Sequence, residues 1–224
     1  MTIEINIPES AKKYMDLQCN SVITDYTECK ELTEIYHFLE KIKKPCKVLE
    51  LGAGLGRVSV YLRNEFNWNN TFFHLLDGDS GDMQIAGMNY AIGDNYYNSM
   101  KATKEYCTEN GIDDYHLVLL SAEGSLGFPK NTYDLCFSCK AIGFHWPIND
   151  YIDRIWPAIV EDGYLFFEMR STRLQDYKDE KRRIRARRYV EHQLKSIDKY
   201  PNLEVLFFST EVEHPIILLK KKSL

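Results

Sequence analysis

The sequence predicts an α/β fold: a mostly parallel sheet of seven strands with an antiparallel last strand pair and helices on both faces. Short apolar segments of strand length alternate with longer amphipathic segments along most of the chain, as in α/β proteins. Most neighbouring strand segments are separated by enough residues for a helical crossover, which parallel strands need. The last two strand segments are too close for a crossover, so we expect them to pair in antiparallel fashion. The length of 224 residues suits one domain with an appendage.

Before the first strand, the pattern predicts helices over residues 9–20 and 25–43, the second ended by Pro45. We expect residues 1–45 to form a helical cap that covers a ligand site or mediates dimerisation, and residues 46–224 to form the main domain. Residues 78–98 form a long connection rich in Gly, Asn and Tyr, which indicates either an acceptor-binding lid or a solvated insertion.

The elements of the main domain follow in chain order. The expected strands are Cys46–Leu51, Thr71–Asp77, Tyr115–Leu120, Tyr133–Ser138, Gly163–Glu168, Leu203–Ser209 and His214–Lys220. The expected helices begin near Gly56 and span about 95–110, 149–159 and 176–196, with Asn110-Gly111 as a stop signal.

The most informative segment runs from Val48 to Arg57 and places glycines at 52, 54 and 56, after a strand and before a helix. Glycines there let the backbone approach a nucleotide-like ligand at the carboxyl edge of a parallel sheet. A dinucleotide fingerprint would place its third glycine at position 57, which is Arg57 here. The spacing therefore argues against NAD or FAD.

The pattern from Glu50 to Gly56 resembles the first motif of class I S-adenosylmethionine-dependent methyltransferases. The resemblance covers residues 46–220 and implies a Rossmann-like fold, with S-adenosylmethionine as cofactor and S-adenosylhomocysteine as product. It implies that this loop packs against the methionine and ribose parts of the cofactor. The residues so implicated are Glu50, Gly52, Ala53, Gly54, Gly56 and Arg57.

The next two strand ends supply the other expected cofactor contacts. Asp77 ends the second strand, about twenty residues past the glycines, where an acid can accept both hydroxyl protons of a ribose. Asp79 is close behind, with Gly78 between them, and a solvated turn acid is the alternative for either. In the family, an Asp-Ala pair after the third strand holds the adenine. Here the segment reads Ser121-Ala122-Glu123, so backbone contacts at Ala122 would have to replace that side chain.

The catalytic chemistry is expected after the fourth strand, which ends at Ser138. Gly143-Phe144-His145-Trp146-Pro147 is similar to a segment of predicted sugar O-methyltransferases, and the Asn/Asp-Pro-Pro-aromatic motif of amine-directed methyltransferases is missing. An alcohol is a poor nucleophile at neutral pH, and imidazole suits removal of its proton. His145 is therefore the candidate base, the alternative being a hydrogen bond that holds its loop.

Further candidates surround this position. Glu168 is an alternative base or a ligand for an acceptor hydroxyl, and Arg170 either binds phosphate or is an exposed residue without a role. Tyr96, Tyr97 and Trp146 are expected to contact the acceptor. No metal is expected, because Cys139-Lys140 stands where metal-assisted O-methyltransferases carry acids.

Nine Lys or Arg side chains lie between residues 170 and 188, although the protein carries a formal charge of −5. Three interpretations stay open: a pocket for a phosphorylated or nucleotide-linked acceptor, an RNA contact, and a solvated helix face balanced by neighbouring acids. The mild overall charge makes nucleic acid an unlikely partner.

The sequence thus favours an O-methyltransferase for a small hydroxylated acceptor, with a sugar of glycan or capsular polysaccharide biosynthesis as the first choice. The alternatives are another acceptor, namely an amine, a phosphoryl-type oxygen or RNA, and a scaffold that binds the cofactor without catalysis. No apolar run approaches the ~20 residues of a membrane helix, and no signal-peptide layout is present. Six scattered cysteines suit reduced thiols, so we expect a cytoplasmic location, with a homodimer as an option.

Overall fold

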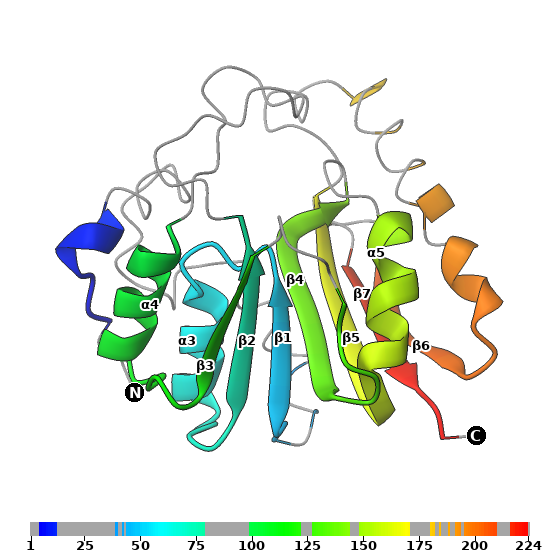
Figure 1. The fold of residues 1–224 in the computed structure, drawn as a ribbon. Helices are drawn as coiled ribbons and strands as arrows, with labels where there is room; N and C mark the ends of the chain where they lie inside the picture. Colours follow the sequence, from blue (N-terminus) through cyan, green and yellow to red (C-terminus); the bar gives the residue numbers. More distant parts are fainter. Residues whose placement is uncertain are drawn as a thin grey trace. The chain divides into compact units, whose positions relative to one another are not determined.

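The computed structural model describes residues 5–12, 39, 42, 44–78, 99–121, 127–143, 148–170, 180–181, 184, 188, 191–193, 195–209 and 216–223. Its strands form one seven-stranded sheet in the order β3-β2-β1-β4-β5-β7-β6 (Figure 1). The strands are β1 (Lys47–Leu51), β2 (Phe72–Asp77), β3 (Leu117–Ser121), β4 (Tyr133–Gly143), β5 (Ile159–Arg170), β6 (Leu203–Ser209) and β7 (Ile216–Lys221). The predicted mostly parallel sheet is confirmed, as is its antiparallel last pair, β6 with β7.

The chain divides into two compact units. The first comprises residues 1–46 and 53–125, and the second comprises residues 47–52 and 126–224. Each is described by itself below.

The first unit contains the parallel pair β2 and β3 with the helices α3 (Arg57–Glu65) and α4 (Met100–Glu109). Its buried side chains come from β2, α3 and α4, for example Phe73 and Leu75 of β2, Leu62 of α3 and Tyr106 of α4. The helix predicted over 95–110 begins at Met100, because Ser99 is extended and its hydroxyl accepts a hydrogen bond from the backbone of Ala102. Gly111 ends it with φ of 96°, as the stop signal predicts.

The third strand begins at Leu117, two residues later than predicted. The backbone N–H of His116 donates to the backbone oxygen of Asp113 at 3.0 Å, and the Asp113 carboxylate accepts from the amides of Tyr115 and His116. This turn uses the N–H groups of Tyr115 and His116, so the strand begins after them. The backbone oxygen of His116 still accepts from the N–H of Phe73 in β2 at 2.7 Å.

The second unit contains β1, β4 and β5 in parallel, followed by β7 and β6 in antiparallel fashion. In β1, the four residues Val48–Leu51 are all buried. This is typical of a central strand whose two faces are both covered. The carboxylate of Asp134 in β4 accepts a hydrogen bond from the backbone N–H of Lys47 at 2.8 Å.

The predictions for the helix at 149–159 and for a strand starting at Gly163 are wrong in their bounds. The helix α5 covers Ile148–Ile155, a 3-10 turn follows over Trp156–Ala158, and β5 begins at Ile159. Between the pairs Tyr133↔Ile159 and Leu135↔Tyr164, β5 contributes extra residues, and Asp162 has φ of 61°. Gly163 therefore belongs to a bulge inside the strand and does not mark its start.

Two further bounds differ from the prediction. The fourth strand continues past Ser138 to Gly143. The last strand, β7, covers Ile216–Lys221, and residues 214 and 215 at its predicted start lie outside the described residues. The charged helix predicted over 176–196 has helical residues up to 193, and a 3-10 helix follows over Lys195–Lys199.

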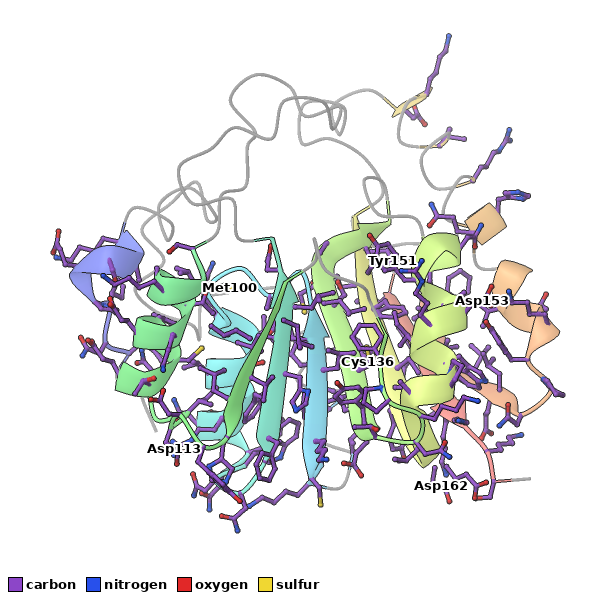
Figure 2. The ribbon with its side chains drawn as sticks, viewed as in Figure 1. Met100, Asp113, Cys136, Tyr151, Asp153 and Asp162 are labelled. Atoms are coloured by element: carbon purple, nitrogen blue, oxygen red, sulfur yellow. The ribbon has the colours of Figure 1, made fainter. Side chains whose placement is uncertain are left out.

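Cys136 and Cys139 of β4 do not form a pair of metal ligands. Cys136 is fully buried in β4, where burial raises the pKa of its thiol well above the ordinary value, so it packs as an uncharged thiol (Figure 2). Cys139 lies three positions later in the same strand and is partly exposed. An odd spacing in a strand directs the two side chains to opposite faces, so the pair cannot grip one ion.

Lys221 places a buried ammonium group in the second unit. Its Nζ donates to the backbone oxygen of Ile159 at 2.7 Å and, at 3.4 Å, to the backbone oxygen of Trp156 and to Oδ1 of Asn131. It also lies 5.9 Å from the centre of the Trp156 ring. Burial lowers the pKa of Lys221.

We expect Lys221→Met to lower the free energy of unfolding by about 1–3 kcal/mol, because buried carbonyl oxygens lose their donor. Since the folded protein binds fewer protons here than the unfolded chain, the wild-type advantage should grow as pH rises toward the ordinary lysine pKa. Urea titrations followed by circular dichroism measure both effects. Lys222→Met is the control, because Lys222 is exposed and forms a surface ion pair with Glu204 at 3.8 Å. Equal losses in the two variants would contradict the prediction.

Candidate functional site

The loop after β1 needs its glycines for two physical reasons. Gly52, Gly54 and Gly56 all have positive φ, of 67°, 55° and 75°. A Cβ on Gly52 would lie 2.0 Å from the Cβ of Ala141, and one on Gly56 would lie 2.7 Å from Leu75 and 2.8 Å from Cys107. Both the conformation and the lack of space therefore exclude larger residues from these positions.

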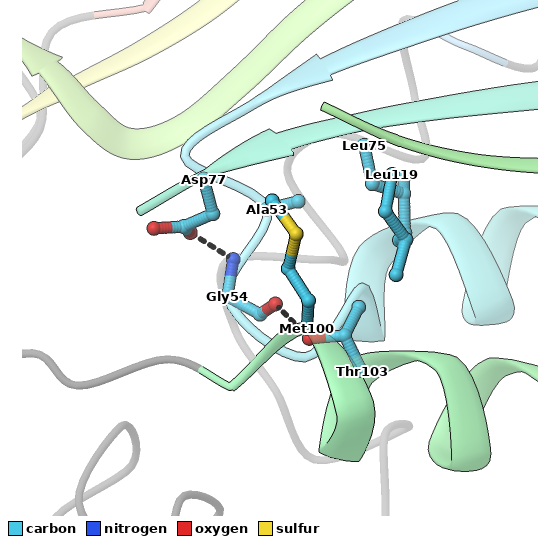
Figure 3. A pocket seen from close by; sticks show the side chains of 7 residues that line it. All are labelled: Ala53, Gly54, Leu75, Asp77, Met100, Thr103 and Leu119. Atoms are coloured by element: carbon cyan, nitrogen blue, oxygen red, sulfur yellow. Dashed lines mark hydrogen bonds between the residues drawn. The ribbon is translucent and has the colours of Figure 1, made fainter. Parts of the chain in front are cut away.

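Asp77 ends β2 and holds this loop. Its Oδ2 accepts a hydrogen bond from the backbone N–H of Gly54 (Figure 3). Its Oδ1 accepts from the N–H of Gly78 at 2.7 Å. Burial raises the pKa of Asp77 above its ordinary value, and the two backbone hydrogen bonds oppose that rise. A carboxylate offers about four acceptor positions, so roughly two remain for hydroxyl groups of a ligand.

A pocket opens beside this carboxylate in the first unit (Figure 3). It has an empty volume of about 170 Å³ and is lined by Ala53, Gly54, Leu75, Asp77, Met100, Thr103 and Leu119. This volume includes open solvent, so the residues form a small depression and not an enclosed cavity. The pocket combines an apolar wall with one carboxylate, which suits a sugar edge bearing hydroxyls.

Thr103 of α4 also holds the glycine loop, and the sequence analysis missed it. Its hydroxyl lies 2.9 Å from the backbone oxygen of Gly54 and 3.1 Å from that of Ser99, its two acceptors. One turn later, the thiol of Cys107 lies 3.6 Å from the backbone oxygen of Leu55. The only sequence signal is a threonine on the face of the helix that is otherwise apolar.

In the second unit, two buried acids share one face of the sheet. Glu50 of β1 is 2% exposed and pairs in register with Phe137, while Glu168 of β5 is 1% exposed and pairs with Cys139. Phe137 and Cys139 are two residues apart in β4, so Glu50 and Glu168 face the same side. Fully buried glutamates are rare, which makes both of them candidates for a functional role.

Ser138 has a clear local role on the opposite face. Its hydroxyl donates to the backbone oxygen of Leu51 at 2.9 Å and accepts from the N–H of Ile142 at 3.3 Å. These bonds join the end of β1 to the extended part of β4. A direct contact with the cofactor stays a prediction.

The remaining candidates divide into two groups. Arg57 is the first residue of α3, Ser121 ends β3 in register with Asp77, and Arg170 ends β5. The other candidates lie outside the described residues: Asp79, Tyr96, Tyr97, Ala122, Glu123, His145 and Trp146. So do most of the proposed lid and most of the basic helix.

Within the described part of the chain, no three His, Cys, Asp or Glu side chains gather closely enough to hold a metal ion. No helix in that part is long and apolar enough to cross a membrane.

Comparisons with known proteins find similarity in structure alone. No protein-family model matches the sequence, and no curated protein matches it. A protein of Methanococcus maripaludis assigned as an S-adenosyl-L-methionine-dependent methyltransferase superposes with a TM-score of 0.58 at 14% identity, over 98% of this chain and 99% of that one. The S-adenosylhomocysteine-bound methyltransferase PaMTH1 of Podospora anserina gives 0.55 at 10% identity, over 97% and 89%.

A protein of Nostoc punctiforme assigned as an O-methyltransferase gives a TM-score of 0.59 at 13% identity. That match covers 93% of this chain and 59% of the Nostoc protein, so this chain spans about three fifths of its length. Identities this low establish the fold and nothing finer. The chain has the fold of S-adenosylmethionine-dependent methyltransferases.

Proposed function

We propose that this chain is an S-adenosylmethionine-dependent O-methyltransferase that acts on a hydroxyl of a small acceptor. The observation that carries the proposal is the carboxylate of Asp77, bonded to the amide of Gly54 beside a pocket in the first unit. A methyltransferase fold with this acid and this glycine loop supports S-adenosylmethionine better than a dinucleotide, whose fingerprint the loop lacks.

The residues present fit the cofactor. When bound, S-adenosylmethionine supplies an electrophilic methyl group on a sulfonium. Asp77 would accept hydrogen bonds from the ribose hydroxyls through its remaining lone pairs, and the glycine loop would let the ligand lie close to the backbone. Glu50 offers a buried carboxylate for the ammonium of the methionine part. Ser121 ends β3, and Ala122 and Glu123 come next in the sequence, where the adenine would be held.

For the acceptor, we propose a sugar, with or without a phosphate or nucleotide attached. The similarity of residues 143–147 to predicted sugar O-methyltransferases supports this choice, and Arg170 at the end of β5 would suit a phosphate. His145 would remove the acceptor proton, with Glu168 as the alternative base. Tyr96, Tyr97 and Trp146 would contact the acceptor. We also propose a cytoplasmic location and a homodimer.

Two measurements test the function in order. Calorimetry with S-adenosylhomocysteine tests the cofactor site, and no measurable binding would reject the proposal. Radiolabelled methyl transfer to a panel of nucleotide sugars, free sugars, amines and RNA then tests the acceptor. Binding without transfer to any class would favour the scaffold, whereas transfer to an amine or to RNA would replace the sugar assignment.

We expect His145→Ala to lower kcat by about 10²–10⁴-fold if His145 is the base, while cofactor affinity is retained. The matched variant is Glu168→Gln, which keeps the size of the side chain and removes its charge. A loss of kcat in Glu168→Gln, with normal turnover in His145→Ala, would transfer the role to Glu168. The pH profile of kcat should lose its acidic limb in whichever variant lacks the base.

We expect Thr103→Val to raise the dissociation constant of S-adenosylhomocysteine about 5-fold. The variant keeps the shape of the side chain but leaves the Gly54 carbonyl without its donor, and such a hydrogen bond contributes about 1 kcal/mol. Thr108→Val is the control on the same helix, because Thr108 is exposed and its hydroxyl donates within the helix, to the backbone oxygen of Lys104 at 2.8 Å. An equal effect of both variants on affinity would contradict a specific role for Thr103.

A further inference from the structure

The N-terminal segment of residues 5–12 lies against α4 in the first unit, as the blue ribbon in Figure 1 shows. The backbone N–H of Asn6 donates to Oδ1 of Asn110 at 2.8 Å, and Nδ2 of Asn110 donates to the backbone oxygen of Asn6 at 2.7 Å. One amide side chain thus satisfies both backbone groups of a residue 104 positions away. Asn110 is only 7% exposed, so its unpaired amide would be costly there.

Further contacts extend this attachment along the helix. Nδ2 of Asn6 donates to Oε2 of Glu109 at 2.8 Å, and the Ser10 hydroxyl donates to Glu105. Ala11 is completely buried, so the segment contributes an apolar contact as well. We call residues 5–12 with these contacts the N-terminal clasp.

The opposite side of α4 holds the glycine loop. Thr103 and Cys107 contact the backbone oxygens of Gly54 and Leu55, as described above. At 100° per residue, positions 105 and 109 lie nearly half a turn around the helix from positions 103 and 107. The clasp therefore holds α4 in two places: through Glu105 and Glu109 on the side away from the cofactor loop, and through Asn110 at the C-terminal end, which by the same count lies on the side of Thr103.

We propose that the N-terminal clasp fixes α4 and, through Thr103, determines how well the glycine loop is ordered for the cofactor, with Asn110 as the positioning residue. The effect on the cofactor rests on the proposed function; the effect on the loop does not. A helix of ten residues is marginal without tertiary contacts, so its position depends on what packs against it. If the loop is competent for only a fraction of the time, the apparent dissociation constant rises by the inverse of that fraction.

Amide hydrogen exchange on the full-length chain tests the proposal without any ligand. The reporters are the amides of Gly54, bonded to Asp77, and of Gly56, bonded to the backbone oxygen of Ala53 at 2.8 Å. We expect Asn110→Ala to speed exchange at both amides about tenfold, and Thr108→Val to leave it unchanged. The proposal is overturned if residues 5–12 lose protection in Asn110→Ala while the loop keeps its own.

Asn110→Ala also removes a hydrogen bond within the helix, because Nδ2 of Asn110 donates to the backbone oxygen of Tyr106 at 2.7 Å. A second variant therefore tests the clasp without changing the helix. The double variant Asn6→Pro/Ser10→Ala changes the clasp and leaves α4 itself unaltered. It removes the N–H that Asn110 binds and the side-chain bonds to Glu109 and Glu105, and it should speed loop exchange about threefold. It carries the test if Asn110→Ala does not fold, and unchanged loop exchange in it overturns the proposal.

Calorimetry with S-adenosylhomocysteine separates the two proposals. We expect the dissociation constant to rise in each clasp variant by the same factor as loop exchange. If wild-type protein does not bind while loop exchange still responds to the clasp, the proposed function fails and the clasp stands. If wild-type protein binds and neither loop exchange nor affinity responds, the clasp fails and the proposed function stands.

Discussion

Gly52→Ala is expected to destabilise the protein by about 3 kcal/mol or more. The added Cβ would lie 2.0 Å from the Cβ of Ala141 in β4, at a φ of 67° that L residues rarely adopt. The left-handed conformation costs about 1–2 kcal/mol, and overpacking against a strand adds about 1–3 kcal/mol. Urea unfolding followed by circular dichroism measures the loss.

Two further variants separate these causes. Gly127→Ala is the control, because its Cβ would meet no atom within 4 Å and its φ is not in the left-handed region. It should change stability by less than about 1 kcal/mol. Gly52→Ala/Ala141→Gly should recover the overpacking part but not the conformational part. If Gly127→Ala costs as much as Gly52→Ala, steric exclusion at the loop is not the reason for its glycines.

Asp77→Ala is expected to weaken S-adenosylhomocysteine binding by about 100-fold or more. It would remove the acceptor proposed for the ribose hydroxyls and release the amide of Gly54. Each hydrogen bond to a charged group contributes about 1.5–3 kcal/mol, so losing two exceeds a factor of 100. Calorimetry measures the change, and a loss below about fivefold would mean that Asp77 does not bind the ribose.

The raised pKa of Asp77 also predicts the direction in which the stability of the protein changes with pH. Since burial raises the pKa of Asp77, the folded protein keeps a proton that the unfolded chain has already lost. The stability contributed by this group is therefore present below the unfolded pKa and is lost as pH rises through the folded pKa. Asp77→Asn should remove that fall, so its stability relative to wild type should rise over this pH window.

The pKa of Asp113, in the same unit, is shifted in the opposite direction to that of Asp77. Its side chain bonds to His116, which lowers the pKa of Asp113, so its contribution is lost as pH falls through that lowered pKa. Asp113→Asn should therefore lose stability relative to wild type as pH rises from strongly acid values. Urea titrations over a series of pH values, from about 3 to about 7, compare the two variants. Slopes of the same sign for both would contradict the assignment at Asp77.

The sequence predicted those residues of the candidate site that lie close to a strand end. Gly52, Gly54 and Gly56 follow a buried strand, and Asp77 ends the next one, so the length of one strand-helix-strand unit brings them together. The role of Thr103 could not be predicted from the sequence, because it depends on which backbone oxygen lies opposite the hydroxyl. The same holds for Ser138, whose hydroxyl is used by the backbone of Leu51 and Ile142.

Periodicity and spacing alone determined the α/β class, the parallel sheet, the antiparallel final pair and the glycine loop, because each depends on residues that are neighbours in the chain. Tertiary structure decided that β7 enters between β5 and β6, that β5 begins before its bulge, and that Asn6 meets Asn110. It also decided that Lys221 is buried against three oxygens. These outcomes depend on contacts between distant segments, and no local pattern carries information about them.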